Sequence, residues 1–284
     1  MKVAIAAGGT AGHINPALAL AEELRERGHK VVFVGQTRRL EATLAPEAGF
    51  PLVPIEVSGF DRSRPWTLIT AVRQIFAAQR ALEAHFSIEG APDAAIGFGA
   101  YVELPLMRWC AKKGIPYLLH EQNSVAGLAN KVSAKGAAAV CIAFPQAEAA
   151  FSGKAKQIVV TGNPVRKSVV SASREDARTA CGLADDEVLL LVFGGSLGAR
   201  HINQAVCGLK GELLSRPKLR ILHSTGKDEY NSVVEALALT EDEAARWTVA
   251  PYIDDMGAAL AAADCVLSRA GASRSSTAAA SGFR

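Results

Sequence analysis

Two glycine-rich segments with the same spacing stand in the two halves of the chain. Residues 4–13 read AIAAGGTAGH, and residues 191–200 read LVFGGSLGAR. Glycines at a strand-to-helix turn let the backbone approach a ligand, and the N–H groups that begin the next helix favour an anion such as phosphate. A single loop of this kind is often only a tight turn. Two equivalent loops favour a nucleotide site at the carboxyl ends of the strands.

Polar side chains follow two other apolar runs. The apolar run 116–119 is followed directly by His120, Glu121, Gln122 and Asn123. Another apolar run, 94–97, leads into the segment GFGAY at residues 97–101. Histidine and carboxylate side chains in such places can act as general bases. We therefore expect a catalytic or binding site where these strands end.

Short Val- and Ile-rich runs alternate with longer amphipathic stretches, which is typical of βα units with parallel sheets. This pattern predicts an α/β fold with two domains, residues 1–163 and residues 164–284, that meet near Asn163 and Pro164. The predicted strands are 2–7, 30–34, 51–57, 94–97, 116–119, 138–142, 157–161, 188–193, 220–223, 247–250 and 265–268.

The composition excludes several classes of protein. Of the 284 residues, 49% are hydrophobic and 21% are charged, which is globular composition. A net charge of +3 is too small for a nucleic-acid binder that neutralises many phosphates. The five cysteines form no CxxC pair, so a reducing cytoplasm fits best. The uncharged run 3–21 contains three glycines and a proline, and we expect neither a signal peptide nor a transmembrane span.

Three functions compete at this point. An oxidoreductase that uses NAD would need an acid after the second strand, where the chain has Gln36, Thr37, Arg38 and Arg39. The two arginines leave NADP open as its cofactor. A nucleotide-binding module without catalysis predicts the loops alone. A two-domain nucleotide-sugar transferase predicts the loops and ionisable residues beside them.

Seven motifs together resemble the MurG family of bacterial N-acetylglucosaminyltransferases. The resemblance implies a GT-B fold, in which two Rossmann-like domains face a cleft. It also implies inverting transfer of N-acetylglucosamine from UDP-N-acetylglucosamine to the C4 hydroxyl of the muramoyl sugar of lipid I, giving lipid II for peptidoglycan synthesis. No cofactor is implied, and no Asp-x-Asp metal motif is present. The motifs are GGTAGHINP (8–16), GFGAY (97–101), HEQN (120–123), GNPVR (162–166), GGSLGA (194–199) extending to Asn203, YIDDM (252–256) and RAGA (269–272).

The resemblance also implies roles for individual residues. His13 and Glu121 are the two alternatives for the general base, and we favour His13 because a helix N-terminus lowers the pKa of histidine. Tyr101 would line the acceptor side. The residues implied for the donor are Thr10, Ala11 and Gly12 for sugar and diphosphate, Asn123 for the sugar, Arg166 and Ser196 for the diphosphate, Asn203, Ile253 for uracil, and Ala272.

The segment 66–86 places apolar residues on a helical stripe, with Arg73 and Arg80 nearby. A stripe of this kind more often faces a core, but it is also typical of helices that lie on an anionic membrane. An acceptor that carries a polyprenyl tail requires its enzyme to act at the bilayer surface. We therefore expect peripheral contact with the cytoplasmic face of the inner membrane, where proteins of cell-wall synthesis are further partners. The stripe consists of Leu68, Ile69, Val72, Ile75, Phe76 and Leu82.

The sequence departs from the family pattern in four places. Thr277 stands where the family has a glutamate for the ribose, and the family continues for about a further fifth of its fold beyond residue 284. We therefore expect a truncated second domain with an incomplete donor site, so that an inactive nucleotide-sugar-binding remnant is an alternative. Ala11 replaces a usual glycine, and residues 103–105 read Glu-Leu-Pro where Ser-Gly-Pro is usual.

Overall fold

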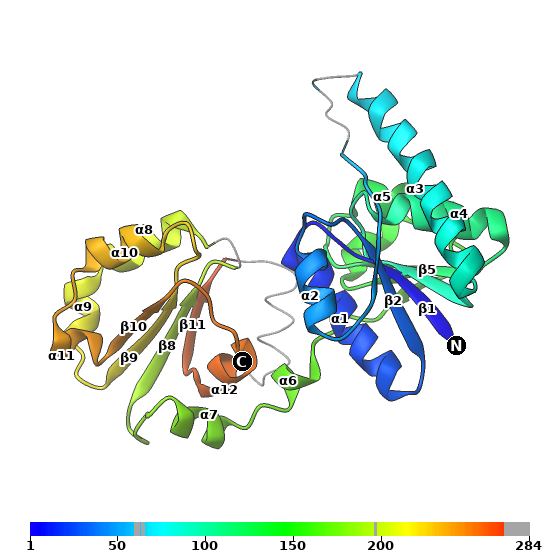
Figure 1. Cartoon of the computed structure of the whole chain (residues 1–284). Coiled ribbons are helices and arrows are strands. Elements are labelled where there is room, and N and C mark those ends of the chain that lie inside the picture. Colours follow the sequence, from blue (N-terminus) through cyan, green and yellow to red (C-terminus); the bar gives the residue numbers. More distant parts are fainter. Residues whose placement is uncertain (60–62, 64–65, 196–197, 270–284) are drawn as a thin grey trace. The chain divides into compact units, whose positions relative to one another are not determined.

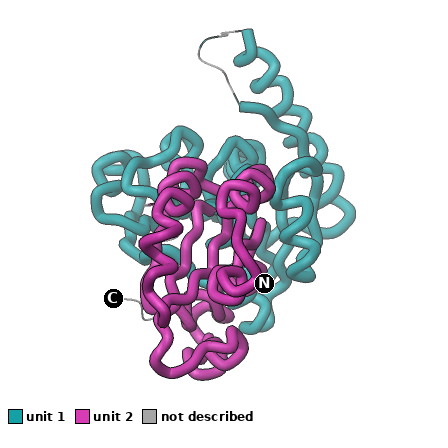
Figure 2. Tube along the Cα trace, turned by 90° about the vertical axis from the view of Figure 1, so that its left-hand side faces the viewer, with its two compact units in different colours: residues 1–166 teal, residues 167–284 magenta. Residues whose placement is uncertain are grey.

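The computed structural model describes residues 1–59, 63, 66–195 and 198–269. The chain divides into two compact units, residues 1–166 (unit 1) and residues 167–284 (unit 2), which are coloured separately in Figure 2. The expected boundary at Asn163 and Pro164 falls inside the end of unit 1. No helix in the described part of the chain is long and apolar enough to span a membrane.

Unit 1 is built on a parallel sheet whose described strands have the order β3-β2-β1-β4-β5-β6-β7 (Figure 1). Every neighbouring pair is parallel, so all carboxyl ends lie at one edge. The order reverses between β1 and β4, where loops diverge to opposite sides of the sheet. The strands are β1 (Lys2–Ala6), β2 (Lys30–Gly35), β3 (Leu52–Pro54), β4 (Ala94–Gly97), β5 (Tyr117–Glu121), β6 (Ala139–Ile142) and β7 (Ile158–Val160).

Helices cover both faces of this sheet because alternate residues of each buried strand point to opposite faces. Val3 and Ile5 of β1 pack with Leu18 of α1. Ala4 and Ala6 belong instead to the core that holds side chains of α3 and α4. The helical segments are α1 (Ala11–Glu26) and α2 (Glu41–Glu47) on one face, α3 (Thr67–Glu89), α4 (Glu103–Lys113) and α5 (Leu128–Ser133) on the other, and the short turns η1 (Ala134–Gly136) and η2 (Pro145–Ala150).

Unit 2 repeats the topology of the first half of unit 1. Its described strands have the order β10-β9-β8-β11, which matches β3-β2-β1-β4, and all pairs are parallel. The repeat of the glycine loops therefore reflects a repeat of the strand order. The strands are β8 (Val188–Phe193), β9 (Leu219–Ser224), β10 (Trp247–Ala250) and β11 (Cys265–Ser268), and the helices are α6 (Lys167–Val170), α7 (Arg174–Ala180), α8 (Arg200–Gly208), α9 (Lys210–Leu214), α10 (Tyr230–Leu237), α11 (Glu241–Ala244) and α12 (Met256–Ala262).

Two strands differ from the sequence-based prediction by more than one residue at an end. β3 is shorter than the predicted 51–57, because only residues 52–54 pair with β2. β5 extends past the predicted end at Leu119, because His120 and Glu121 pair with Cys141 and Ile142 of β6. Two polar residues are thereby held in the sheet at its carboxyl edge.

The second glycine loop gives a test of backbone packing in unit 2. Gly198 has a φ of +76°, and a Cβ there would collide with the backbone carbonyl of Thr225. We expect Gly198→Ala to lower the free energy of unfolding of unit 2 by about 2 kcal/mol or more, from clash and left-handed strain. Urea unfolding followed by Trp247 fluorescence measures it. Gly211→Ala is the control, since a Cβ in that helix meets nothing within 4 Å and should stabilise by roughly 0.5 kcal/mol.

Candidate active site

The loops that follow β1, β4 and β5 lie next to one another at the carboxyl edge of the unit 1 sheet. These three strands are adjacent, and the switch in strand order falls between β1 and β4. In open α/β sheets, ligands bind at such a switch point. The fold thus brings the first glycine loop, the GFGAY segment and the HEQN segment together, although up to about 110 residues separate them in the chain.

His13 lies in the first turn of α1, next to the switch point. Its Nδ1 is 3.0 Å from the hydroxyl oxygen of Thr10, the N-cap residue of the helix. The Thr10 hydroxyl caps no backbone N–H. The imidazole packs against the loop after β4, because a Cβ on Gly99 would lie 3.3 Å from His13 Cδ2 and 3.4 Å from Nε2. The ring is therefore held from both sides of the switch point.

Burial lowers the pKa of His13 below its ordinary value of 6.5. The negative charges of Glu121 and Glu41 and a hydrogen bond with the Gly8 backbone oppose this shift and only partly cancel it. The imidazole is therefore neutral at pH 7, which is the form that can accept a proton.

The carboxylate of Glu121 is fully engaged by neighbouring N–H groups. It is 1% exposed. Oε1 accepts hydrogen bonds from the backbone N–H and the side-chain amide of Asn123, at 3.0 and 3.1 Å. Oε2 accepts from the Gly127 backbone at 2.8 Å and from the Asn130 amide at 3.0 Å. A carboxylate with four donors is a structural acceptor, and this geometry favours His13 over Glu121 as the base.

Of the other residues of the HEQN segment, His120 and Gln122 are buried and hydrogen-bonded to each other, and Asn123 is exposed. The His120 ring is held by the Gly162 carbonyl at 3.0 Å and by the Gln122 amide at 3.2 Å, and burial lowers its pKa. Asn123 is exposed, at the rim of the loop. Of this segment, Asn123 is thus the side chain best placed to meet a ligand.

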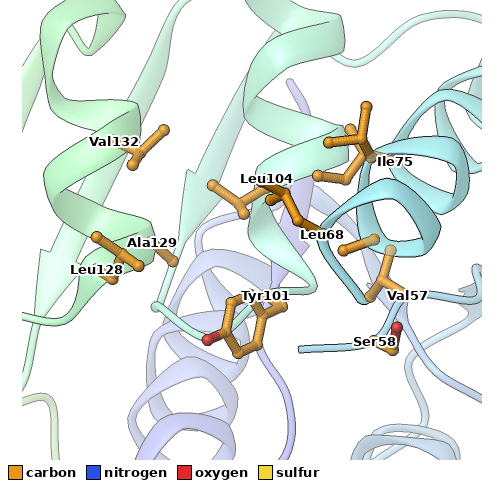
Figure 3. Close-up of a pocket in the computed structure, with 11 residues that line it drawn as sticks. Val57, Ser58, Leu68, Ile75, Tyr101, Leu104, Leu128, Ala129 and Val132 are labelled. Carbon is orange, nitrogen blue, oxygen red and sulfur yellow. The ribbon is translucent and has the colours of Figure 1, made fainter. Parts of the chain in front are cut away.

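Tyr101 follows a strained turn and faces an apolar pocket. Gly99 and Ala100 both have positive φ angles, +83° and +64°, and the second is unfavourable for alanine. Figure 3 shows the Tyr101 ring at one end of a cavity of about 130 Å³ between α3, α4 and α5. The cavity is lined by Val57, Ser58, Leu68, Ala71, Val72, Ile75, Tyr101, Leu104, Leu128, Ala129 and Val132. We call it the apolar pocket.

Arg166 does not lie beside the first glycine loop. Its guanidinium donates to Glu22 Oε1 through Nη2 at 2.6 Å and Nε at 3.1 Å. Glu22 stands about three turns along α1 from Ala11. The predicted diphosphate contact of Arg166 would require this ion pair to open.

Asn203 of α8 is buried, and its two polar atoms are engaged within unit 2. Its amide donates to the Thr225 carbonyl at 3.0 Å, and its oxygen lies 3.0 Å from His223 Nε2. Burial lowers the pKa of His223 to about 4, so this ring is neutral and donates to Asn203. The sequence predicted a donor contact for Asn203, whereas the structure uses its side chain to join α8 to the end of β9.

The remaining predicted residues have diverse positions. Thr10 is exposed, Ala11 and Gly12 are half-buried in the first turn of α1, and Ile253 is half-buried after β10. Ser196 and Ala272, like Thr277, lie outside the described residues. Among the described residues no group of three His, Cys, Asp or Glu side chains could hold a metal ion.

Sequence reasoning missed the part that Glu103 plays in this site. Glu103 is fully buried, and its Oε2 accepts the Gly99 N–H at 2.6 Å. Burial raises its pKa to about 8, and the nearby charge of Glu121 adds to the rise. The feature of the sequence that relates to this buried side chain is the glycine at position 97, because a Cβ there would lie 2.5 Å from Glu103 Oε2.

Comparisons with known proteins agree on one family. Residues 3–142 match the glycosyltransferase family 28 N-terminal domain, and residues 189–282 match the family 28 C-terminal domain. The chain is 40% identical over 279 residues to the UDP-N-acetylglucosamine--N-acetylmuramyl-(pentapeptide) pyrophosphoryl-undecaprenol N-acetylglucosamine transferase of Acetivibrio thermocellus, covering 96% of this chain and 73% of that protein. It is 39% identical over 277 residues to the transferase of the same name from Desulforamulus reducens, covering 96% and 74%.

Solved structures agree with the sequence relatives. A crystal structure of Acinetobacter baumannii MurG has a TM-score of 0.68 and 30% identity, covering 99% of this chain and 76% of that one. The UDP-GlcNAc 2-epimerase from Neisseria meningitidis, bound to UDP-GlcNAc, has a TM-score of 0.64 at 11% identity, covering 95% and 78%. The second likeness concerns the fold alone.

The hydrogen bonds of Glu121 allow a test of whether it is a structural acceptor or the general base. In Glu121→Gln, one carboxylate oxygen becomes an NH₂ group that faces two N–H donors. We expect the free energy of unfolding of unit 1 to fall by about 3 kcal/mol, since buried donors lose a charged acceptor. Urea unfolding measures this, with Glu148→Gln on exposed η2 as the control. Unchanged stability together with lost activity would instead assign Glu121 as the base.

Proposed function

The chain belongs to glycosyltransferase family 28, and we propose that it transfers N-acetylglucosamine from UDP-N-acetylglucosamine to undecaprenyl-pyrophosphoryl-N-acetylmuramyl-pentapeptide. The product is lipid II, the precursor of peptidoglycan. The observation that carries the assignment is the similarity to transferases of this activity over 96% of the chain. The fold is GT-B, with two parallel-sheet units of the Rossmann type.

His13 serves as the general base of this reaction. The C4 hydroxyl oxygen of the muramoyl sugar forms a bond to C1 of N-acetylglucosamine from the face opposite UDP. His13 Nε2 accepts the hydroxyl proton, while the C1–O bond to UDP breaks and its electron pair leaves with the diphosphate. In this proposal Nδ1 carries the hydrogen and donates it to Thr10 Oγ1, 3.0 Å away, and the lone pair of Nε2 accepts the proton.

The first glycine loop and Asn123 act on the donor. The N-terminus of α1 carries partial positive charge, and no acidic residue stands in its first turn to neutralise it. Thr10, Ala11 and Gly12 are placed there to stabilise negative charge that develops on the leaving diphosphate. Asn123 is exposed on the adjacent loop and meets the transferred sugar.

Unit 2 binds the uridine part of the donor. Ile253 is half-buried and follows β10 at the carboxyl edge of the second sheet, and in this proposal its backbone binds uracil. Asn203 contributes by fixing the adjacent loop after β9. Arg166 and Ser196 contact the diphosphate in this proposal, and Ala272 belongs to the same donor site. Tyr101 lines the acceptor side.

Two alternatives from the sequence have less support. The NADP-dependent oxidoreductase had rested on Arg38 and Arg39, and the relatives of this chain are transferases. A remnant that binds nucleotide sugar without turnover differs from the enzyme only in the transfer step. A transfer assay therefore decides between the enzyme and the remnant.

The lowered pKa of His13 predicts the pH profile of transfer. The base is active when neutral, so kcat/KM should fall as His13 protonates in acid, with a midpoint below the ordinary histidine value of 6.5. Labelled UDP-N-acetylglucosamine and a short-chain lipid I analogue measure the rate. His13→Ala should reduce kcat by roughly 10²–10⁴-fold. Absence of transfer by the wild-type chain would contradict the proposed function, and full transfer by His13→Ala would contradict the role of His13.

The exposed half of α3 contacts the cytoplasmic face of the membrane. The first half of α3 extends away from the body of unit 1 (Figures 1 and 2), and Leu68, Ile69 and Phe76 are 50%, 65% and 43% exposed. Leu82 on the same stripe is fully buried, so the stripe is divided between membrane and core. Arg108 and Lys112 lie over the Phe76 ring at 5.4 and 5.7 Å, which places cations where anionic headgroups would be.

Substitution of one exposed apolar residue tests the membrane contact. Ile69→Glu should weaken binding to phosphatidylglycerol-containing vesicles about tenfold, because it removes roughly 1.5 kcal/mol of apolar burial and adds negative charge. Vesicle co-sedimentation measures the binding. The control is Ile88→Glu at the other end of α3, where the side chain is 83% exposed. Equal effects of the two substitutions would contradict the proposed surface.

A further inference from the structure

The carboxylate of Glu41 is buried directly beneath the first glycine loop. Glu41 begins α2 and is 1% exposed. Its Oε2 accepts the Gly9 backbone N–H at 3.0 Å, and its Oε1 accepts the Gln36 backbone N–H at 3.1 Å. One side chain therefore joins the loop after β1 to the loop after β2.

Two glycines leave the space that this carboxylate occupies. A Cβ on Gly8 would collide with Glu41 Oε1, and a Cβ on Gly35 would lie 2.5 Å from Glu41 Cγ. Gly35 ends β2, Gly8 lies two residues past the end of β1, and neither has a positive φ. Their lack of a side chain is thus required by the approach of Glu41.

The loop after β1, which Glu41 binds at Gly9, continues directly into the first turn of α1, where His13 lies. Gly9 precedes Thr10, whose hydroxyl lies 3.0 Å from His13 Nδ1. Gly8, against which the carboxylate packs, supplies the backbone group that bonds His13. Loss of the Glu41 contacts would free the residues that hold one side of the imidazole.

Three carboxyl groups surround His13 from different elements. Glu121 on β5 and Glu41 on α2 both raise the pKa of His13 through their negative charge. Glu103 on α4 bonds Gly99, on which the ring packs. Only Glu41 combines a charge that acts on His13 with hydrogen bonds to the loop that carries Thr10.

We infer that Glu41 is a positioning residue for His13, which acts by fixing the backbone of residues 8–10 with a buried carboxylate. The inference rests on the proposed function only in taking His13 as the base. A carboxylate is required at position 41 because two N–H donors meet it and both of its oxygens accept. Glutamine has the same size but presents an NH₂ group to one of these donors.

The test compares Glu41→Gln with wild type by NMR on the full 284-residue chain, with Glu47→Gln at the exposed end of α2 as the matched control. The His13 Cε1–H resonance, assigned with His13→Gln, reports its titration, and Gly9 amide exchange reports the loop. In Glu41→Gln we expect the His13 pKa to fall below that of wild type, because a negative charge is lost while the buried side-chain volume is kept. Gly9 exchange should rise about tenfold or more.

Transfer activity supplies the second readout. Glu41→Gln should lower kcat about tenfold or more, because displacement of the base slows proton transfer. A His13 titration, Gly9 exchange and kcat that all equal those of wild type would overturn the inference. If wild type shows no transfer, the proposed function fails, while the NMR comparison still decides the role of Glu41. If Glu41→Gln does not fold, Glu41→Asp retains the charge but retracts it by one methylene, and faster Gly9 exchange is then the expected result.

Discussion

Backbone N–H groups at the carboxyl edge of the first sheet need acceptors, and the carboxyl groups of buried glutamates supply them. Glu121 receives four N–H groups, Glu103 receives the N–H of Gly99, and Glu41 receives two. A buried carboxylate is stable only when donors surround it, and a buried N–H is stable only when it is accepted. The buried carboxyl groups and the N–H groups therefore satisfy each other by hydrogen bonding. These hydrogen bonds fix the loops around His13.

The same arrangement sets the chemistry of His13. Burial lowers its pKa, while the carboxylates near it raise the pKa, and burial has the larger effect. The imidazole is therefore neutral at pH 7. The carboxylates are themselves hidden behind the loops, so the exposed side presents the N-terminus of α1. A helix N-terminus with partial positive charge and a group of buried glutamates thereby coexist at one sheet edge.

The sequence predicted what depends on local pattern. The strands Ala94–Gly97, Val188–Phe193 and Trp247–Ala250 match the prediction because each is a short apolar run with clear ends. It did not predict the burial of Glu41 and Glu103, since a glutamate in the first turn of a helix is ordinarily solvated. It also could not divide the α3 stripe, because periodicity gives the face of a helix but not how far a neighbouring element covers it. For Asn203, a motif marked an important residue without revealing that its side chain turns inward.

Unit 1 consists of one uninterrupted stretch of the chain, residues 1–166, and every described strand of its sheet comes from that stretch. During synthesis the ribosome releases the chain from its N-terminus, at about 5–20 residues per second. Unit 1 can therefore complete its sheet, bury its glutamates and order the loops around His13 while unit 2 is still being translated. Errors in unit 2 would then leave a folded first unit behind, and cellular proteases would meet the two halves as separate substrates.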